Sequence, residues 1–357
     1  MSKFWEVIIN SRGKDRFYCF PFLFLFRIIA PVYQLFSRQN LEKRKMRCSR
    51  EWKARVISIG NITVGGSGKT PIIVRLARGF LAAGKKIAIV HSGYGRESKD
   101  DFIIPANSSE TFTPKQIGDE TAMMRLMLPS VGFAVGRNKK AMVIAADREL
   151  APDIILIDDG FQRLDIEKDV DIAIVSSELF PECDDKAGRK KLRLFPAGIL
   201  REQISALERA HVIFSVTDSE QLASNLIAYS IDKPVFDWQM RFAGIYRGDK
   251  KIADETIRQL KPLVFAGIGS FGRMLEMIEQ EGIPVKRSHN FGDHYRYDTL
   301  DFEHLKYMRE EAKADCYLTT AKDLVKLPPI GLDAPLYCLA FDATPLDENI
   351  FSRLMAG

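Results

Sequence analysis

A glycine-rich loop that ends in a lysine and a threonine is the part of this sequence whose residue types most directly imply chemistry. Residues 63–70 read TVGGSGKT, after the apolar run ARVISIG and before an amphipathic helical pattern. In such a loop, backbone N–H groups at a helix N-terminus bind phosphates, Lys69 reaches the outer phosphate oxygens, and the Thr70 hydroxyl ligates Mg²⁺. Thr63 replaces the first glycine of G-x-x-x-x-G-K-[ST], yet the strand-to-helix context favours a nucleotide site over a structural turn. The expected nucleotide-binding residues are Thr63, Val64, Gly65, Gly66, Ser67, Gly68, Lys69 and Thr70.

Two adjacent acids end the next strongly apolar segment. DIILIDDGFQ, residues 153–162, predicts a strand that terminates in Asp158 and Asp159. A carboxylate at a strand end beside a phosphate-binding loop holds the Mg²⁺ shell in P-loop nucleoside triphosphatases. Because two buried acids are costly without a cation, we expect at least one of them to bind the metal; capping of the following turn is the alternative.

Other polar groups follow predicted strands or glycine turns. The segment HSGYGR places Ser92 and Tyr94 at the sheet edge where ligands bind in open α/β folds. The segment IGDET supplies Asp119 and Glu120, which either accept a hydroxyl proton or cap a helix. Arginine and glutamate in LFPAGILRE either contact substrate or form a surface ion pair. The candidate substrate or phosphate contacts are Ser92, Tyr94, Gln162, Arg201 and Glu202.

In the second half of the chain, polar residues gather in two further segments. HNFGDHYRY contains His294 beside Asp293, and a lone loop histidine is more often solvated than catalytic. YLTTAKDLVKL ends a predicted strand before Lys322 and Asp323. GIGSFG at residues 267–272 has the form of a dinucleotide-binding turn, but no acidic partner follows at the expected distance, so we assign it no such role.

The alternation of Val/Ile-rich strands with helices predicts an α/β fold. We expect a P-loop NTPase-like, mostly parallel sheet domain and a smaller Rossmann-like α/β domain with helices near 271–282 and 299–313. Between them, PVFDWQMRFAGIYRGDKKI predicts two strands around Gly248. The expected regions are a membrane-associating N-terminal helix (1–40), the P-loop domain (41–233), a hairpin linker (234–252) and the smaller domain (253–357).

The N-terminal region combines aromatic residues with excess positive charge. Residues 1–56 carry 13 Lys and Arg against 4 Asp and Glu, whereas the whole chain of 357 residues has a net charge of +5. The apolar run at residues 17–26 is interrupted by Arg27 and is shorter than a spanning helix requires. This combination favours a segment that lies in the headgroup region of an anionic membrane surface. A helix packed on the protein's own core and a true anchor helix are the alternatives.

Composition also limits the classes of partner. Five widely separated cysteines with no CxxC pair support neither a zinc site nor a disulfide framework. The basic excess coincides with the aromatic segment, so we expect no nucleic-acid binding. No obligate protein partner is evident.

Eight segments together resemble one enzyme family. GNITVGGSGKTP, SGYGR, GDE, DDGFQ, FPAGILRE, FAGIGSFGRM, DHYRY and LTTAKDLVKL occur in the order and spacing of the tetraacyldisaccharide 4′-kinases, the lipid A 4′-kinases of Gram-negative bacteria. The family's loop also lacks the first glycine. The resemblance implies transfer of the ATP γ-phosphate, with Mg²⁺, to the 4′-hydroxyl of an acylated disaccharide 1-phosphate. It places a peripheral, monotopic protein at the cytoplasmic face of the bacterial inner membrane.

The resemblance also implies roles for individual residues. Lys69 and Thr70 correspond to the phosphate lysine and the magnesium threonine, and Asp158 and Asp159 to the metal-binding acids. Asp119 corresponds to the base that takes the 4′-hydroxyl proton. His294 from the other domain corresponds to its partner, so the expected catalytic residues are Asp119, His294 and Lys69.

The sequence departs from the family pattern at several positions. Arg163 stands where members carry histidine, Ser92 is followed directly by glycine without the family's arginine, and Ala321 replaces a glutamate. The arginine expected near residues 137–140 is either Arg137 or replaced by Lys139, and the two residue types are not equivalent at a bidentate phosphate contact.

Two other classes share part of this signature. A P-loop GTPase-like assembly or metal-insertion factor should have an N/TKxD segment that recognises the base, and TAKDL, which contains Asp323, matches this segment only superficially. A membrane-bound binding or scaffold protein would hold nucleotide without turnover.

Overall fold

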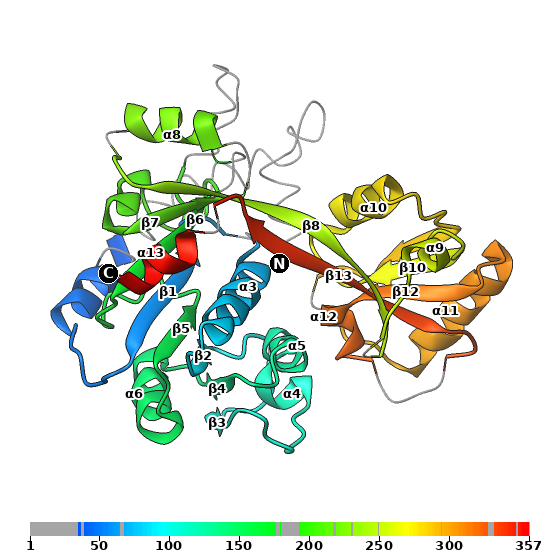
Figure 1. Ribbon diagram of the computed structural model, residues 1–357, viewed down its shortest axis with the longest axis horizontal. Helices are drawn as coiled ribbons and strands as arrows, with labels where there is room; N and C mark the ends of the chain where they lie inside the picture. The colour runs from blue at the N-terminus through cyan, green and yellow to red at the C-terminus, as the bar shows by residue number, and fades with distance from the viewer. Residues whose placement is uncertain are drawn as a thin grey trace.

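The computed structural model describes most of the chain (Figure 1). The described residues are 35–36, 39–64, 68–175, 179, 193–216, 219–229, 231–248, 250–293, 295–327, 332–347 and 349–356. The apolar run at 17–26, loop residues 65–67 and His294 lie outside them, so the predictions made for these residues stay predictions. No helix within the described ranges is both long and apolar enough to cross a membrane.

The first lobe contains a mostly parallel sheet. Five of its strands, β4, β2, β5, β1 and β6, pair in parallel in that order, β7 continues the sheet beyond β6, and β3 pairs antiparallel with β4. The strands are β1 (Arg55–Asn61), β2 (Ile87–His91), β3 (Phe102–Ile104), β4 (Gly132–Val135), β5 (Ile154–Asp158), β6 (Val170–Val175) and β7 (Val212–Ser215). This confirms the expected α/β class, the predicted strand before the glycine loop and the strand that ends at Asp158, whereas Asp159, predicted to end the same strand, lies in the turn that follows.

Helices cover both faces of this sheet because its strands are apolar on both sides. Ile57 and Ile59 of β1 pack in one core cluster with helix α3 (Lys69–Ala82), whereas Val56 packs in another with helix α6 (Lys139–Leu150). The period of two along β1 therefore divides its side chains between the two layers. Further first-lobe helices include α4 (Pro114–Ile117), α5 (Asp119–Met127), the 3₁₀ helix η2 (Ile204–Arg209) and α8 (Ser219–Ala228).

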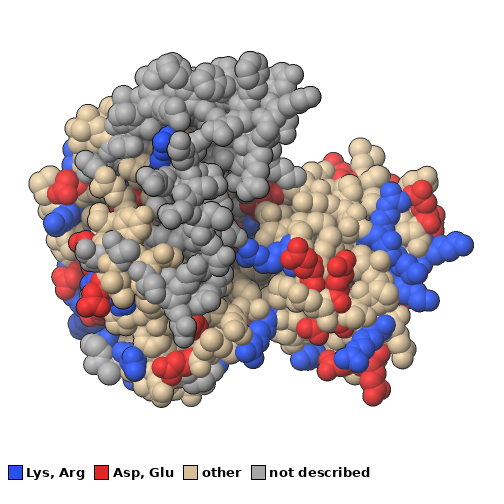
Figure 2. All heavy atoms as spheres, turned by 90° about the horizontal axis from the view of Figure 1, so that it is seen from above, with Lys and Arg blue, Asp and Glu red and all other residues tan. Residues whose placement is uncertain are grey.

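The second lobe is a smaller α/β unit that extends the same sheet. Its inner strands pair in parallel (Figure 1). Residues of α10 and α11 lie in two separate core clusters. Its elements are α9 (Asp254–Ile257), β10 (Pro262–Ala266), α10 (Phe271–Gln280), β11 (Arg287–Asn290), α11 (Thr299–Ala312), β12 (Cys316–Thr320) and α12 (Ala321–Leu324). Figure 2 shows acidic and basic side chains together on the face of this lobe that is turned to the viewer.

Two long strands connect the lobes and belong to both. β8 (Val235–Arg247) pairs in parallel with β7 and then antiparallel with β13 (Leu336–Pro345), and its end pairs with β9 (Lys250–Lys251) around Gly248. Helix α13 (Ile350–Ala356) follows β13.

The core packing changes one expected boundary. Residues 253–357 were predicted to form the smaller domain alone. Instead, Ala343, Ile350 and Leu354 are buried in the same cluster as Phe80 of α3. The C-terminal segment therefore belongs to the first lobe, and the second lobe is an insertion between β8 and β13. Residues 234–252, predicted to be a linker, contain β8, which pairs with strands of both lobes.

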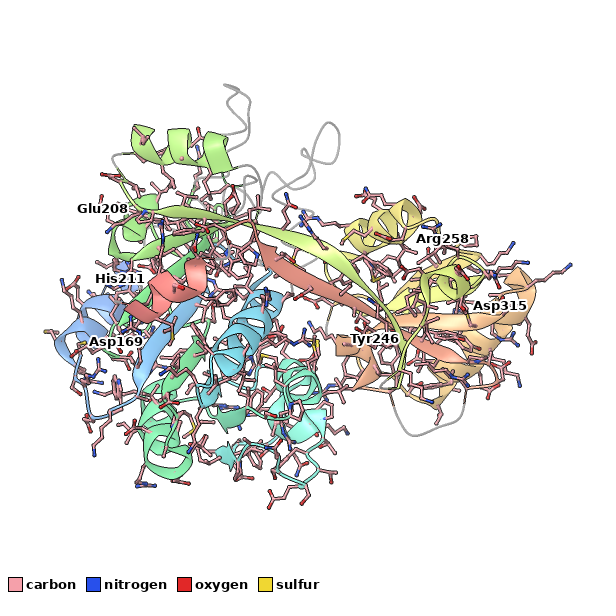
Figure 3. The ribbon with its side chains drawn as sticks, viewed as in Figure 1. Asp169, Glu208, His211, Tyr246, Arg258 and Asp315 are labelled. Carbon is pink, nitrogen blue, oxygen red and sulfur yellow. The ribbon has the colours of Figure 1, made fainter. Side chains whose placement is uncertain are left out.

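Aspartate side chains satisfy backbone N–H groups near the starts of strands in both lobes. Asp169 Oδ2 accepts from the N–H of Val56 at 2.7 Å, and Asp315 Oδ1 accepts from the N–H of Lys261 at 3.0 Å. Figure 3 labels both aspartates, one in each lobe. These contacts fix where the strands begin and therefore which residues reach their carboxyl ends.

Candidate active site

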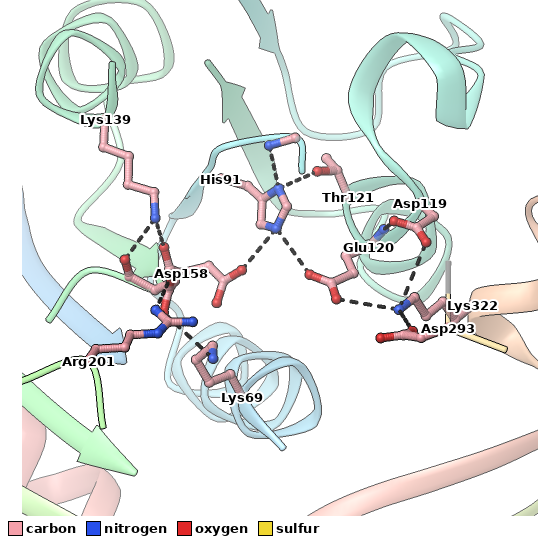
Figure 4. Close-up of polar contacts among 12 residues, drawn as sticks. Lys69, His91, Asp119, Glu120, Thr121, Lys139, Asp158, Arg201, Asp293 and Lys322 are labelled. Carbon is pink, nitrogen blue, oxygen red and sulfur yellow. Dashed lines mark hydrogen bonds and ion pairs between the residues drawn. The ribbon is translucent and has the colours of Figure 1, made fainter. Parts of the chain in front are cut away.

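The candidate site lies where β1, β2 and β5 end, beside the N-terminus of α3 (Figure 4). The glycine loop begins at β1: the Val64 N–H donates to the Ile199 carbonyl at 2.7 Å, and Thr63 accepts from Asn61 Nδ2 at 3.0 Å. Gly68 enters α3 with a φ of 71°, a conformation that favours glycine. The loop thus joins the sheet to the helix N-terminus as the sequence predicted.

Lys69 and Arg201 converge on Asp159. The Lys69 Nζ lies 3.6 Å from Asp159 Oδ1, and the Arg201 Nη1 lies 3.0 Å from both Asp159 carboxylate oxygens. Burial raises the pKa of Asp159, but Lys69, Arg201 and Lys139 outweigh that effect and lower it to about 2. In this state Asp159 is a neutralised anion, and the lysine expected to bind phosphate is held against it.

Lys139 supports the turn that carries the two acids. Its buried Nζ donates to the backbone carbonyls of Asp158 and Asp159, at 2.5 and 2.8 Å. Asp159 has a φ of 50°, and such a non-glycine conformation needs support from its surroundings. Arg137 is exposed. Of the two residues considered for the family's arginine, Lys139 binds backbone carbonyls at the site.

Asp158, His91 and Glu120 form a compact cluster. The His91 side chain is 2% exposed, and its Nε2 lies 2.9 Å from Asp158 Oδ2 and 3.5 Å from Glu120 Oε2. The other Asp158 oxygen, Oδ1, is buried and has no hydrogen-bond partner among the described residues. One ligand atom from each of the three residues lies within 4.8 Å of the others, a spacing that would fit a metal ion.

The second lobe contributes a cation to the same site. Lys322 lies in α12. Its Nζ is 3.1 Å from Asp293 Oδ1, 3.9 Å from Asp119 Oδ2 and 3.8 Å from Glu120 Oε1. Burial lowers the pKa of Lys322, and the three carboxylates outweigh this and raise it. Asp119 and Glu120 occupy the first turn of α5, where the helix dipole favours negative charge. The structure thus brings the expected base together with a charge from the other lobe.

Of the remaining predicted substrate contacts, Gln162 and Glu202 form hydrogen bonds within the protein, whereas Ser92 and Tyr94 lie beside the site. Gln162 Nε2 donates to the Asn61 carbonyl and to Glu202 Oε1, both at 2.9 Å. Glu202 also accepts two hydrogen bonds from Arg209, both at 2.8 Å. Ser92 is half-buried beside His91, and Tyr94 is 67% exposed. Gln162 and Glu202 therefore fix the segment that presents Arg201, while Ser92 and Tyr94 stay predicted substrate contacts.

Two other departures from the family pattern are Arg163 and Ala321. Arg163 forms an ion pair with Asp165, with Nη2 and Oδ2 2.6 Å apart, and Ala321 is the first residue of α12. Burial lowers the pKa of Lys139, and Arg163 also lies close enough to that lysine to lower it, while Ala321 directly precedes Lys322.

Asp323 occupies a position unlike that of a guanine-recognising acid. Its side chain is fully buried, and its oxygens accept from the Gly267 N–H, the Tyr297 hydroxyl and the Thr320 hydroxyl at 2.9, 2.9 and 2.7 Å. These bonds hold the turn after β10. The carboxylate is thus a structural part of the second lobe.

Sequence reasoning gave no role to His91 and none to Lys322. The signal for His91 was its place at the carboxyl end of an apolar strand, directly before a glycine turn. The signal for Lys322 was its place after the β12 strand end, but no local pattern tells which lobe its ammonium group contacts.

A family model described as tetraacyldisaccharide-1-P 4′-kinase matches residues 19–356. The chain belongs to this family. A tetraacyldisaccharide 4′-kinase of Chlorobaculum parvum is 31% identical over 314 residues, which cover 85% of this chain and 84% of the relative. Another from Geobacter metallireducens is 29% identical over 276 residues, covering 77% of this chain and 79% of the relative. The family membership expected from the eight segments is confirmed.

A solved structure supports the same assignment. The crystal structure of LpxK from Aquifex aeolicus in complex with ATP has 25% sequence identity and a TM-score of 0.70, and the match covers 92% of this chain and 96% of that one. A tetraacyldisaccharide 4′-kinase from the same organism is 29% identical over 310 residues, covering 86% of this chain and 88% of the relative. The likeness therefore spans both lobes, and the kinase fold predicted from the sequence is confirmed.

Proposed function

We propose that this protein is an ATP-dependent kinase that transfers the γ-phosphate to the 4′-hydroxyl of tetraacyldisaccharide 1-phosphate in lipid A biosynthesis. The observation that carries the proposal is that Lys69 lies beside the acids at the end of β5, with Asp119 across the same site (Figure 4). Phosphoryl transfer depends mainly on positioning and charge neutralisation, and this site supplies both.

Lys69 would change partners when nucleotide binds. Lys69 is the first residue of α3, and its ammonium group lies near Asp159. The outer phosphates of ATP at this helix N-terminus would draw Lys69 away, while Arg201 continues to neutralise Asp159. Lys69 would thus exchange its contact with Asp159 for contacts with the phosphates.

Magnesium fits the residues present. The buried Asp158 Oδ1 has no hydrogen-bond partner among the described residues, and a buried carboxylate oxygen is costly without one. Carboxylate and hydroxyl oxygens are the ligands Mg²⁺ prefers, so Asp158 and Thr70 would hold it. The ion would neutralise charge on the transferring phosphate. Asp159 is the less suitable direct ligand in this state because Arg201 contacts both of its oxygens.

Asp119 would act as the general base for the 4′-hydroxyl. Its carboxylate is buried at the start of α5 and lies across the site from the strand-end acids (Figure 4). Its Oδ1 accepts from the Glu120 N–H at 3.0 Å, which fixes the orientation of the carboxylate. His294, predicted to assist it, lies outside the described residues, but its neighbour Asp293 contacts Lys322 at the same site.

The lipid substrate would reach this site from a membrane surface. Exposed Leu35 and Phe36 precede a helix at residues 39–46 that carries several exposed Lys and Arg side chains. Apolar and basic groups side by side suit an anionic leaflet. We propose that the protein is peripheral at the cytoplasmic face of the bacterial inner membrane, with the acyl chains near residues 17–36.

Transfer of label from γ-labelled ATP to tetraacyldisaccharide 1-phosphate in detergent micelles tests the proposal. Wild type should label the lipid in a Mg²⁺-dependent manner, and Asp119→Ala should lower kcat by roughly 10²-fold or more, the scale of general-base loss. Glu110→Ala, an exposed acid on the preceding loop, is the control. Binding of ATP by wild type without any labelled lipid would overturn the proposal.

A further inference from the structure

We propose that His91 is a positioning residue that orients Asp158 and Glu120 for the metal–nucleotide complex by donating a hydrogen bond, and that it is not itself a metal ligand. The proposal rests on the function proposed above. It concerns a buried side chain to which the sequence motifs assign no role.

The protonation pattern of His91 follows from its Nδ1 contacts. The backbone N–H of Gly93 points at Nδ1 with a separation of 2.8 Å, and a backbone N–H can only donate. Nδ1 must therefore supply its lone pair. The Thr121 hydroxyl, also 2.8 Å from Nδ1, can donate to the same atom. The ring is thus held as the tautomer with its proton on Nε2.

Two influences act on the charge of this ring. Burial lowers the pKa of His91, while the hydrogen bonds to Asp158 and Glu120 raise it to about 9 and so favour the charged ring. A second proton would have to sit on Nδ1, facing the Gly93 N–H. The geometry therefore decides for the neutral ring with a single proton on Nε2.

That proton lies between two carboxylates. Nε2 is 2.9 Å from Asp158 Oδ2 and 3.5 Å from Glu120 Oε2. Donation to Asp158 Oδ2 leaves Oδ1 as the buried oxygen without a described partner. On the other side, Glu120 Oε1 faces Lys322 at 3.8 Å. His91 thus sets which oxygen of Asp158 is available, and the two acids are kept from turning toward each other.

The same contacts argue against His91 as a ligand. A metal-bound imidazole gives its Nε2 lone pair to the ion and normally donates from Nδ1–H. Here Nδ1 accepts from Gly93, so binding an ion at Nε2 would require both lone pairs of the ring. The spacing of His91, Glu120 and Asp158 resembles a three-ligand metal site, but the donor pattern is that of an oriented carboxylate pair.

Two substitutions separate the roles of the two ring nitrogens. The amide nitrogen in His91→Gln occupies roughly the place of Nε2 and keeps a donor for Asp158. The amide oxygen in His91→Asn occupies roughly the place of Nδ1 and keeps an acceptor for Gly93, but no donor reaches Asp158. His304→Asn, on the exposed face of α11, is the matched control.

We expect the Gln variant to retain wild-type behaviour more closely than the Asn variant. His91→Asn should weaken Mn²⁺ binding to the complex with a non-hydrolysable ATP analogue by roughly 10- to 100-fold, the usual effect of losing a group that orients a metal ligand. Mn²⁺ electron paramagnetic resonance measures this without any lipid turnover. kcat for lipid labelling should fall in parallel, and His91→Gln should recover most of both.

The outcomes separate this inference from the proposed function. Equal loss of Mn²⁺ affinity in both variants, with unchanged melting temperatures, would overturn the donor role. Visible absorption of bound Co²⁺ that changes in His91→Gln would make His91 a ligand and would also overturn it. Failure of wild type to label the lipid, with the Mn²⁺ pattern as expected, would reject the lipid substrate and leave the role of His91 intact.

Discussion

Replacing Lys322 by methionine tests whether the second lobe completes the active site through charge. The substitution keeps an unbranched side chain of similar length and removes the ammonium group. Asp119, Glu120 and Asp293, now 3.1–3.9 Å from that group, would face one another without their shared cation. At about 4 Å and an effective dielectric constant near 20, each attraction is about 4 kcal/mol before desolvation is subtracted.

The net effect is smaller than the sum of these attractions. The Lys322 side chain is 14% exposed and that of Asp119 is 9% exposed, so burial of the charges offsets much of the gain. Breaking a buried pair costs about 3–5 kcal/mol of folding stability, and we expect the lower end of this range to apply in the transition state, where Asp119 must be correctly placed. A loss of about 3 kcal/mol in the transition state corresponds to a decrease in kcat of roughly 100-fold.

Steady-state labelling of the lipid, with ATP and lipid varied separately, measures the effect. We expect kcat to fall while the KM for ATP changes little, because Lys69 and its loop belong to the first lobe. Lys306→Met, at an exposed position in the same lobe, is the control. Adding Asp293→Asn to Lys322→Met should recover part of the loss, since one uncompensated charge is removed. A Lys322→Met kcat within about twofold of the control would refute the argument, because it would show that the shared cation contributes nothing at the transition state.

Three further predictions concern packing, pH and the membrane. A Cβ at Gly60 would lie 2.6 Å from the Phe161 Cβ, so Gly60→Ala should lower the free energy of unfolding by about 1–3 kcal/mol; in urea titrations Gly272→Ala, with open space at its Cβ, should show no such loss. Because the pKa of Asp159 is lowered from 3.8 to about 2, its ionised carboxylate stabilises the fold at pH values above about 3.8, and this stabilisation is lost as the pH falls toward 2. Asp159→Asn should therefore flatten the decrease in the free energy of unfolding at acidic pH, and parallel curves for variant and wild type would contradict this. Deleting residues 1–36 should impair lipid labelling more than ATP binding, and equal impairment of both would count against membrane contact by this segment.

The sequence predicted the strands and the helix around the first-lobe site because their signals are local. The apolar run before Lys69, the glycines and the helical period after them all fall within one stretch of chain. The strand ending in Asp158 was likewise defined by its own residues. The order of these strands in the sheet was not predicted, because it depends on which distant segments pair.

What could not be predicted depends on contacts between distant segments. Asp323 resembled part of a guanine-recognition motif, and only its bonds to Gly267 and Tyr297 show that it is structural. The pairing of β13 with β8, and hence the return of the chain to the first lobe, has no local signature. For His91, the decisive fact is the direction of the Gly93 N–H, which sequence alone does not give.

The return of the chain through β13 also has a consequence for biosynthesis. The core around Phe80 includes Ile350 and Leu354, with the Phe351 ring packed edge-on against Phe80 at 6.1 Å. Ribosomes add residues from the N-terminus, so the second lobe emerges complete while the nucleotide-binding lobe still lacks this apolar surface. The lobe that carries the P-loop is therefore the first to be started and the last to be finished.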